Sequence, residues 1–589
     1  MKIKFIGHSY HQSTKSSQFF IQIVESLGGI DYWWDESWMK PGENNDFGDL
    51  TPFDLVIVWQ LPHIIRRIPD EIRSRTVYVP MHDAVEGLED KFWRRLKGIR
   101  ILSLSMATHI KALKQGLPAL FAQYYPEPSP QAHDFDGLRL FFWQRQRSPN
   151  WRTVSAHLPP CQFDAIHIHR SVDPGAGEFV APLPCEVKAH HITFSDWFES
   201  KDDLLEVMKS CNTYVAPRES EGIGMSLLEA LSMGMVCIAK DAPTMNEYII
   251  DGVNGHLIND LSTTAIEIHA PETTSRQALH YIEKGRLNYE ARIPAIRAFL
   301  THRPTAQPRS RHWALDRVLP PPPPSSTWMA ELDQLFEKFR ARKRPDTPHV
   351  SVITVVRNDA NGLLKTLHSV FSQTYQNFEY VVIDGASTDA TRQVLAKYHG
   401  AMDAQASGPD QGPYDAMNKG AQLARGDFVI YMNAGDEFFD AQALQSAMAM
   451  HPQDADIIYG HHIFITKKKR PEYRKAHGLQ QSFDRLKNGT LDKHWLRGIP
   501  CHQSTITRRT LITQRGYDWQ TFRVAADLDL LLDAIADGAN VYHSNTTISR
   551  YYGGGMSSKQ GDICALNWQS IFHKHCDRQA LIEQLFKKS

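Results

Sequence analysis

The chain has 589 residues, and its 42% hydrophobic and 22% charged composition is typical of a soluble globular protein of about four domains. Its 65 Lys and Arg residues nearly balance 66 Asp and Glu residues, so the net charge of −1 argues against nucleic acid as the main partner. No run of about 18 apolar residues predicts a membrane-spanning helix, and seven cysteines without a CxxC pair predict reduced thiols rather than disulfides or a zinc site.

Short apolar runs that alternate with helical stretches predict buried parallel strands in the first half of the chain. The first series lies at 2–7, 54–60, 76–80 and 100–104, and the second at 138–143, 190–194, 212–216 and 235–239. The opening sequence MKIKFIGHSY lacks the apolar region of a signal peptide, so we expect a cytoplasmic protein. We therefore predict two Rossmann-like α/β domains, at 1–130 and 131–302.

Residues 303–348 break this pattern. They contain five consecutive prolines at 320–324 and the basic run KFRARKR at 338–344. Because proline fixes φ and donates no backbone hydrogen bond, this composition predicts a stiff linker. Beyond it, apolar runs at 350–356, 378–384 and 428–434 predict a third α/β domain, at 349–589.

The segment ESEGIGMSLLEALSMG at 219–234 follows a predicted strand and begins a helix. Gly222 and Gly224 would let a phosphate approach backbone N–H groups at a helix start, where the helix dipole favours anions. Glu221 and Glu229 suit the hydroxyl groups of a sugar and a ribose, because a carboxylate accepts several hydrogen bonds. An ordinary structural role is the alternative for these residues. Next, NEYIIDGVNGHLI predicts a helix, a turn and a strand.

This combination resembles the donor-binding half of glycosyltransferase family 4, which has the GT-B fold and a signature of two Glu residues separated by seven others. The resemblance implies that Glu221 contacts the donor sugar, that Glu229 contacts the nucleotide ribose and that the two glycines lie at the phosphates. The first domain would then bind the acceptor.

The chain departs from that family at three places. The family holds the diphosphate with an Arg and a Lys five residues apart; Arg145 is present here, but Asn150 stands in the Lys position. The segment 7–17 has one glycine where the family has a Gly-rich acceptor loop. His82 matches a His near the donor sugar, and a helix cap formed by Asp83 is the alternative interpretation of this pair.

Acidic residues follow several strands of the third predicted domain. Asp384 ends the strand FEYVVID, and Asp389 comes shortly after it. The carboxyl ends of parallel strands are where ligands bind in open α/β sheets. The segment GPDQGPYDAMNKG then begins a helix with Asp410, Asn418 and Lys419. Helix capping is the structural alternative for the aspartates.

Four later motifs complete this pattern. They are NAGD with Asp436, PCHQST with His502, RVAADLDL with Asp527 and YYGGGMSS with Gly554. In this order the motifs resemble glycosyltransferase family 2, of the GT-A fold, across about 350–560, and in particular its bacterial surface-polysaccharide branch typified by colanic-acid transferases. A turn at Asp436 and a loose glycine loop are the structural alternatives.

The family 2 resemblance implies a role for each acid. Asp384 would contact the nucleobase, Asp410 would lie beside the nucleotide, Asp436 would hold Mg²⁺ or Mn²⁺ on the diphosphate, and Asp527 would be the general base of an inverting transfer. Asp389, Asn418 and Lys419 would join the donor site, the loop with Gly554 would close over the diphosphate, and His502 would be an accessory ligand or acceptor contact, or a structural His. The usual DxD triplet reads Asn433-Ala434-Gly435 here, which leaves Asp436 as the remaining acid.

The sequence thus predicts a bifunctional glycosyltransferase: a retaining GT-B module, a linker and an inverting GT-A module. Nucleotide sugars would be the donors, and a glycan or lipid-linked oligosaccharide of O-antigen or capsule type the acceptor. The basic runs at 338–344 and 466–475 are either solvated faces or contacts with the inner face of the cytoplasmic membrane. We expect no nucleic-acid partner.

Two alternatives stay open. In the first, only the GT-A module transfers sugar, and the GT-B half is a non-catalytic acceptor-binding or scaffold module. In the second, the chain is a nucleotide-sugar pyrophosphorylase, which requires a Gly- and Arg-rich phosphate loop where VVRNDANG at 355–362 offers only Arg357.

Overall fold

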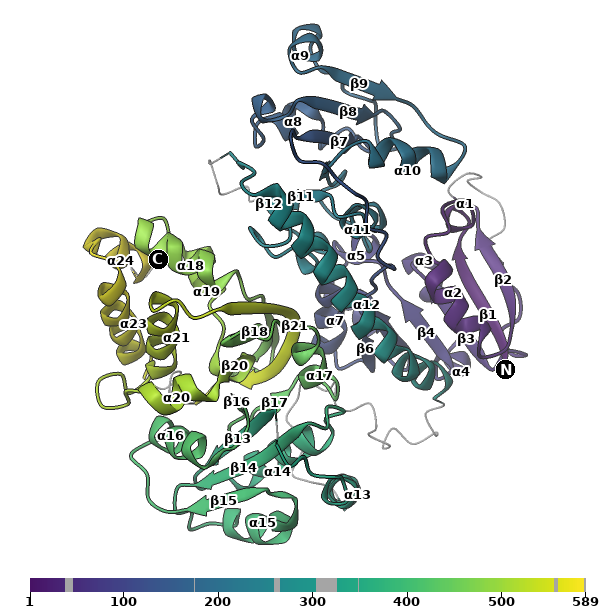
Figure 1. Ribbon diagram of the computed structural model, residues 1–589. Helices are drawn as coiled ribbons and strands as arrows, with labels where there is room; N and C mark the ends of the chain where they lie inside the picture. Colours follow the sequence, from purple (N-terminus) through teal and green to yellow (C-terminus); the bar gives the residue numbers. More distant parts are fainter. Residues whose placement is uncertain are drawn as a thin grey trace. The chain divides into compact units, whose positions relative to one another are not determined.

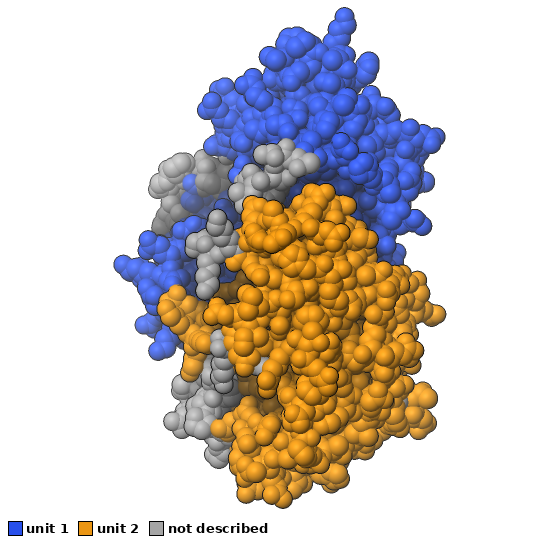
Figure 2. All heavy atoms as spheres, turned by 90° about the vertical axis from the view of Figure 1, so that its left-hand side faces the viewer, with its two compact units in different colours: residues 1–317 blue, residues 318–589 orange. Residues whose placement is uncertain are grey.

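The computed structural model describes residues 1–37, 46–173, 175–258, 265–302, 326–347, 349–555 and 560–586. The chain forms two compact units, an N-terminal unit of residues 1–317 and a C-terminal unit of residues 318–589 (Figures 1 and 2). The predicted proline linker at 320–324 lies outside the described residues. The N-terminal unit combines helices with two parallel sheets and the C-terminal unit combines helices with a mixed sheet, so the expected α/β class is confirmed.

The first sheet of the N-terminal unit has six parallel strands in the order β2-β1-β3-β4-β5-β6. Their bounds are β1 Lys2–His8, β2 Gly29–Asp35, β3 Leu55–Trp59, β4 Thr76–Val79, β5 Arg100–Ser103 and β6 Ala119–Phe121. Four of them confirm predicted strands. The apolar pattern does not reveal β2, because it is an edge strand with several exposed residues, or β6, because it has only 3 residues.

The second sheet has six parallel strands in the order β12-β11-β10-β7-β8-β9. Their bounds are β7 Arg139–Trp143, β8 Ala165–His169, β9 Ile192–Ser195, β10 Thr213–Val215, β11 Val236–Lys240 and β12 His256–Ile258. The expected helix near 246–250 is instead one short 3₁₀ turn, Met245–Glu247. Its Glu247 accepts hydrogen bonds from the backbone N–H groups of Met106 (2.7 Å) and Ala107 (3.0 Å) in the first sheet's half of the unit.

A long helix, α12 (Pro271–Thr301), joins the two halves of the N-terminal unit (Figure 1). It packs on α11 (Met225–Ser232) and on α2 (Gln18–Glu25). Nε of Arg297 donates to Oγ of Ser26 at 3.1 Å, and one hydrophobic cluster contains residues from both sheets. The other helices of this unit are α1 Tyr10–Thr14, α3 Pro62–Ile65, α4 Asp70–Arg73, α5 His82–Val85, α6 Asp90–Arg94, α7 Met106–Lys114, α8 Trp151–Ser155, α9 Pro184–Ala189 and α10 Lys201–Lys209.

The C-terminal unit is built on a nine-stranded mixed sheet in the order β15-β14-β13-β16-β20-β18-β21-β17, with β19 paired to β18. The strands are β13 Val350–Val356, β14 Phe378–Asp384, β15 Ala404–Ser407, β16 Phe428–Tyr431, β17 Glu437–Phe438, β18 Ile457–Ile465, β19 Pro471–Arg474, β20 Thr505–Arg508 and β21 Val541–Tyr552. β13, β14, β15 and β16 run parallel, as the predicted strands require. Their carboxyl ends carry the predicted acidic residues.

Helices cover this sheet. They are α13 Ser326–Arg340, α14 Ala360–Phe371, α15 Thr391–Tyr398, α16 Pro413–Leu423, α17 Ala443–Met448, α18 Leu479–Asn488, α19 Lys493–Arg497, α20 Arg509–Arg515, α21 Ala526–Ala536, α23 Gly561–His575 and α24 Gln579–Phe586. Among the described residues, none of the helices is both long and apolar enough to cross a bilayer.

Helix α13 lies in the stretch that we expected to be linker. The ring of Trp328 stacks on His368 at 5.5 Å, and the ring of Phe339 stacks on Phe371 at 4.8 Å. Its aromatic and aliphatic side chains recur at helical spacing, so one face is buried against α14. Residues 326–340 are therefore part of the C-terminal unit rather than a spacer.

Candidate active sites

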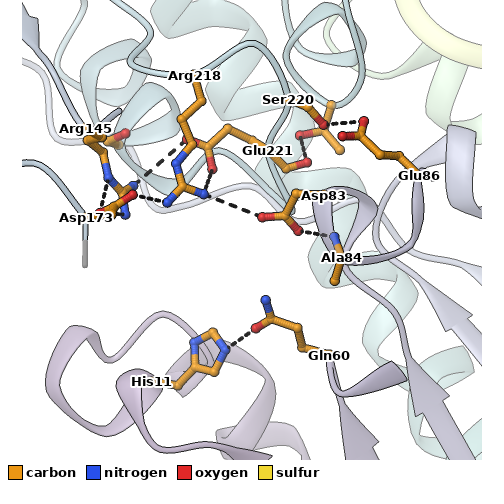
Figure 3. A network of polar contacts seen from close by, with 12 residues as sticks. His11, Gln60, Asp83, Ala84, Glu86, Arg145, Asp173, Arg218, Ser220 and Glu221 are labelled. Carbon is orange, nitrogen blue, oxygen red and sulfur yellow. Dashed lines mark hydrogen bonds and ion pairs between the residues drawn. The ribbon is translucent and has the colours of Figure 1, made fainter. Parts of the chain in front are cut away.

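The N-terminal unit brings five charged side chains together at the carboxyl ends of its strands (Figure 3). Asp83 follows β4, Arg145 follows β7, Asp173 follows β8, and Arg218 and Glu221 follow β10. None of these side chains is more than 25% exposed. The structure thus groups two predicted residues, Arg145 and Glu221, with three charged residues to which the sequence assigned no such role.

Asp173 connects the two arginines. Its Oδ1 accepts from Nη2 of Arg145 at 2.9 Å, and its Oδ2 pairs with Nη2 of Arg218. Nη1 of Arg218 lies 3.6 Å from Oδ2 of Asp83 and 3.9 Å from Oε2 of Glu221. Nη1 of Arg145 lies 4.0 Å from Oε1 of Glu221. Three carboxyl groups therefore surround two guanidinium groups.

Burial and the neighbouring charges shift the pKa values of Glu221, Asp83 and Arg218. Burial raises the pKa of both Glu221 and Asp83, an effect that Arg218 opposes at each carboxyl. Burial lowers the pKa of Arg218, but Glu221, Asp173 and Asp83 together raise it above its usual value. The Arg218 guanidinium therefore stays charged, while Glu221 and Asp83 bind a proton more readily than exposed acids do.

The glycines of the predicted loop bring Glu221 close to the first half of the unit. Gly224 has φ +79° at the start of α11, a conformation that L side chains rarely adopt. A Cβ on Gly222 would lie 3.0 Å from Cβ of Met81, so a larger residue would require Met81 or the loop to shift by a few tenths of an ångström. Glu229 lies half-buried in the second turn of α11.

Asn150 has a structural role at the start of α8. Its Oδ1 accepts from the backbone N–H of Thr153 at 3.3 Å, and Thr153 Oγ1 accepts from the backbone N–H of Asn150 at 2.9 Å. This reciprocal pair is a capping box. The residue at the expected Lys position therefore caps a helix.

His82 is 6% exposed, and burial lowers its pKa, so the ring is neutral near pH 7. Its Nε2 lies 3.5 Å from Oε2 of Glu86, which accepts from Oγ of Ser220 at 2.8 Å (Figure 3). Met81, not Asp83, is the N-cap of α5, and Asp83 accepts from the next backbone N–H at 2.8 Å.

A second polar pair lies in the first half of the same unit (Figure 3). Nε2 of His11, on α1, lies 2.5 Å from Oε1 of Gln60, which follows β3 with φ +70°. Burial lowers the pKa of His11 to about 4, so this ring is neutral as well. The segment that lacks the expected glycines thus forms a short helix with a half-buried His.

In the C-terminal unit, Asp527 is held by two side chains in the first turn of α21. The hydroxyl of Tyr414 donates to Oδ1 at 2.6 Å, and Nδ1 of His502 lies 3.0 Å from Oδ2. Because a carboxylate only accepts, Nδ1 carries the proton, and Nε2 accepts from Nδ2 of Asn433 at 3.0 Å. Burial raises the pKa of Asp527, but hydrogen bonds from His502 and Tyr414 bring it below its usual value. Asp527 is therefore ionised at neutral pH.

Asp436 lies between β16 and β17 and is 7% exposed. Nε2 of Gln503 donates to its Oδ2 at 2.8 Å, and the backbone N–H of Tyr552 donates to its Oδ1 at 3.3 Å. Oδ1 of Asn433 and Oε1 of Gln503 are buried, and neither has a hydrogen-bond partner in the described part of the chain. Burial raises the pKa of Asp436.

These oxygens fit a hard divalent cation. Mg²⁺ prefers oxygen ligands and is commonly bound by one or two carboxylates, with phosphate and water completing its coordination. Across the described residues, no three His, Cys, Asp or Glu side chains converge into a metal-binding group. Asp436 and the unpartnered oxygen of Asn433 are therefore the ligands available for a cation that is shared with a phosphate.

A buried ion pair supports the turn that holds Asp436. Nζ of Lys365 lies 3.2 Å from Oε2 of Glu437, and the hydroxyl of Tyr552 donates to the same oxygen at 2.5 Å. Nζ of Lys365 also donates to the carbonyl of Gly435 at 2.8 Å. These bonds fix the backbone on both sides of Asp436.

Asp384 and Asp410 lie at neighbouring strand ends. Asp384 is 1% exposed and accepts from Oγ of Ser407 at 2.6 Å. The carboxylate of Asp410 packs against the Cα of Gly385, where any side chain would clash with it. Nη1 of Arg357 lies 3.9 Å from Oδ1 of Asp410. Asp384, Asp410 and Arg357 thus place two acids and one cation at the carboxyl ends of neighbouring strands of this sheet.

The remaining predicted donor residues have partners within the chain. Asp389 accepts from the backbone N–H of Thr391 at 3.0 Å, and Lys419 donates to Asp415 at 2.9 Å. Both amide atoms of Asn418 bond the backbone of Tyr517. Gly554 has φ +118°, and residues 556–558 of the predicted closing loop lie outside the described residues.

Comparisons with known proteins agree with this arrangement. Residues 351–516 match the family model described as Glycosyl transferase family 2, and residues 177–269 match the model described as Glycosyl transferases group 1. A PGL/p-HBAD biosynthesis glycosyltransferase of Mycobacterium bovis is 30% identical over 218 residues, which are 36% of this chain and 80% of that protein. The chain belongs to glycosyl transferase family 2. The predicted succession of a GT-B-like and a GT-A module is confirmed by the order of the two matches.

Two further similarities concern shorter or more distant matches. TuaG of Bacillus subtilis, named for teichuronic acid biosynthesis, is 32% identical to this glycosyltransferase over 95 residues, 15% of this chain and 37% of TuaG. The crystal structure of S. aureus TarS 1-349 is 19% identical, with a TM-score of 0.27, and covers 40% of this chain and 69% of that chain.

Four residues of this glycosyltransferase escaped the sequence analysis. Arg218 and Asp173 follow strands of the second sheet, whereas Tyr414 and Gln503 stand beside residues that were singled out. Arg218 directly follows the β10 segment, so its position at a strand end was a usable signal. The strand before Asp173, AIHIH, alternates Ile and His instead of forming a continuous apolar run, so the prediction from apolar runs did not include it.

Proposed function

We propose that this glycosyltransferase is bifunctional. The N-terminal unit, with domains at 1–130 and 131–302, transfers one sugar with retention, and the domain at 349–589 transfers another with inversion. Nucleotide sugars are the donors, and a growing lipid-linked surface polysaccharide of O-antigen or capsule type is the acceptor. The observation that carries this proposal is the presence of a separate polar site at strand ends in each unit, one around Glu221 and one around Asp527.

In the C-terminal unit, Asp527 is the general base. Its ionised carboxylate takes the proton of the acceptor hydroxyl as that oxygen attacks the anomeric carbon from the face opposite the leaving diphosphate. Tyr414 and His502 orient the carboxylate and keep its pKa low. A base positioned in this way contributes about 10²–10⁴-fold to the rate.

Asp436 and Asn433 would hold Mg²⁺ or Mn²⁺ in this unit. The cation, when bound, neutralises charge on the nucleoside diphosphate leaving group. Asp384 and Asp410 bind the nucleobase side of the donor, and Asp389 and Lys419 line the same edge. Asn418 supports this edge through its bonds to the backbone of Tyr517. Gly554 lets its loop close over the diphosphate, and His502 also contacts the acceptor.

In the N-terminal unit, Glu221 contacts the donor sugar and Glu229 the ribose. Gly222 and Gly224 lie at the phosphates, at the N-terminus of α11. His82 is close enough to the Glu221 loop, through Glu86 and Ser220, to contact the sugar.

A basic hairpin tip is our candidate for contact with the inner face of the cytoplasmic membrane. Residues 467–470, KKKR, are exposed at the turn between β18 and β19. Each cation near an anionic lipid surface contributes about 1 kcal/mol. The other basic run is less available, because Arg342 is 6% exposed and pairs with Asp403 at 3.1 Å.

A second candidate function is favoured by Asn150. Since this residue caps α8 and the arginines are already paired with Asp173, the N-terminal unit has a weakened diphosphate site. In that case the unit binds the acceptor and only the C-terminal unit transfers sugar.

Transfer from a panel of nucleotide sugars to a lipid-linked acceptor distinguishes the two candidates. We expect Asp527→Asn and Glu221→Gln each to abolish transfer from a different donor. Asp529→Asn and Glu219→Gln are matched controls, because these acids lie near the two sites and pair with lysines. If Glu221→Gln changes no transfer, the N-terminal unit is a binding module.

A further inference from the structure

The two arginines of the N-terminal site converge on one carboxylate (Figure 3). Oδ1 of Asp173 accepts from Nε of Arg145 at 3.1 Å and from Nη2 at 2.9 Å, while Oδ2 pairs with Arg218. The three residues follow β7, β8 and β10, with β7 between the other two in the sheet. Two guanidinium groups that share one small anion form a clamp for an anionic group.

Several buried polar atoms of residues near this clamp have no hydrogen-bond partner within the described residues. Nε of Arg218, Oε1 of Glu221 and Nδ1 of His82 are buried, and each lacks a hydrogen-bond partner in the described part of the chain. Glu221 is 8% exposed and His82 is 6% exposed. Buried polar atoms are normally hydrogen-bonded, so unpartnered atoms on Arg218 and Glu221 indicate a place that a ligand completes.

The charge balance limits what can enter. With Asp83, Asp173 and Glu221 around Arg145 and Arg218, the carboxyl groups outnumber the guanidinium groups. A second anion therefore enters most readily by replacing one of the carboxylates. Asp173 is the one that engages both arginines, and a phosphate offers the same paired oxygen acceptors.

We propose that Arg145 and Arg218 bind the diphosphate of the donor in the N-terminal unit, and that Asp173 occupies the clamp until the nucleotide displaces it. This inference rests on the donor site proposed above for that unit. Arg218 thereby supplies, from β10, the second cation that Asn150 does not provide.

Calorimetric titration with UDP and with GDP tests the proposal on the full chain. The parent carries Asp436→Asn and is kept in EDTA, so that cation-assisted binding in the C-terminal unit is removed. Cross-linking with an azido-UDP, mapped by mass spectrometry, then identifies binding within residues 131–302. Arg147→Gln is the matched control, because Arg147 is an exposed arginine of the same loop.

We expect Arg218→Gln to weaken nucleotide binding about tenfold or more and Asp173→Asn to strengthen it by a similar factor. If the ion pair were only structural, both substitutions would break it and both would weaken binding, which would overturn the proposal. Equal affinity in all variants would overturn it too. If the parent itself binds neither nucleotide in this unit, the donor role proposed above fails, and this inference fails with it.

Discussion

Tyr414 on α16 donates a 2.6 Å hydrogen bond from its hydroxyl to Oδ1 of Asp527 on α21. The second carboxylate oxygen faces Nδ1 of His502 at 3.0 Å. The side chain of Asp527 is half-buried; burial raises its pKa, and the bonds from His502 and Tyr414 bring it below its usual value. Tyr414 and His502 therefore keep the proposed base ionised.

Replacing Tyr414 by Phe removes one donor to the ionised carboxylate. We expect the pKa of Asp527 to rise, and the acidic limb of the pH–rate profile of the C-terminal reaction to move to higher pH. The direction follows because the base works when ionised, so a higher pKa requires a higher pH. The maximal rate above that limb should fall only a few-fold.

The control for this substitution is Tyr380→Phe. Its hydroxyl is also buried, but it donates to Oγ1 of Thr354 at 3.0 Å, away from Asp527. A profile that shifts equally in both variants, or in neither, would contradict a role for Tyr414 in setting the pKa of the base.

Asp436→Asn should raise the Mn²⁺ concentration needed for half-maximal C-terminal transfer at least tenfold. The reason is that the site offers few charged ligands, so removal of one charge has a large effect. Asp440→Asn is the control, because Asp440 caps a turn a few residues later. EDTA should abolish the C-terminal reaction, and Mn²⁺ should restore it. Activity that persists in EDTA would refute the cation site.

The sequence predicted the strand ends well because buried parallel strands are continuous apolar runs. β13, β14 and β16 carry such runs, and the acids after them could be placed at one sheet edge. β2 and β8 carry aromatic or His residues instead, so periodicity did not reveal them. The residues that follow an unrecognised strand, such as Asp173, could not be assigned to a site.

Side-chain pairings were harder to predict than positions. Nothing local in the sequence indicates that Arg218 and Arg145, 73 positions apart, meet on Asp173, because the contact depends on the order of strands in the sheet. The linker prediction failed in part for a different reason. The proline run at 320–324 predicts a linker, but Trp328, Leu332 and Phe339 recur at helical spacing. These three side chains are buried and hold α13 on the C-terminal unit.

Substitution of Asn418 distinguishes a contact with the nucleotide-sugar donor from a contact that only stabilises the fold. Nδ2 of Asn418 donates to the carbonyl of Tyr517 at 3.0 Å, and its Oδ1 accepts from the backbone N–H of Tyr517 at 2.8 Å. We expect Asn418→Ala to lower the free energy of unfolding by about 1–3 kcal/mol, with little change in the KM for the donor. The control is Gln422→Ala on the same helix, whose bond to Thr513 is longer, at 3.4 Å. A large rise in KM with unchanged stability would favour the donor contact.

The pair of Lys365 and Glu437 predicts a pH-dependent stability. The side chains are 10% and 13% exposed, and burial raises the pKa of Glu437 while Lys365 and Arg550 lower it below its usual value overall. Because the pKa of Glu437 is lower in the folded state than in the unfolded state, its carboxylate stabilises the fold at pH values above the unfolded-state pKa. This stabilisation is lost as the pH falls through the folded-state pKa.

Lys365→Met leaves the buried carboxylate without its closest cation. We expect a loss of about 3–5 kcal/mol in the free energy of unfolding at pH 7, measured by urea denaturation of the full chain. The loss should shrink at pH 4, where protonation of Glu437 becomes easier in the variant, and the double variant with Glu437→Gln should recover much of it. Lys397→Met is the control, because its pair with Asp333 is about half exposed. An equal loss at both pH values would show that packing of the lysine stem, not the charge pair, stabilises the turn around Asp436.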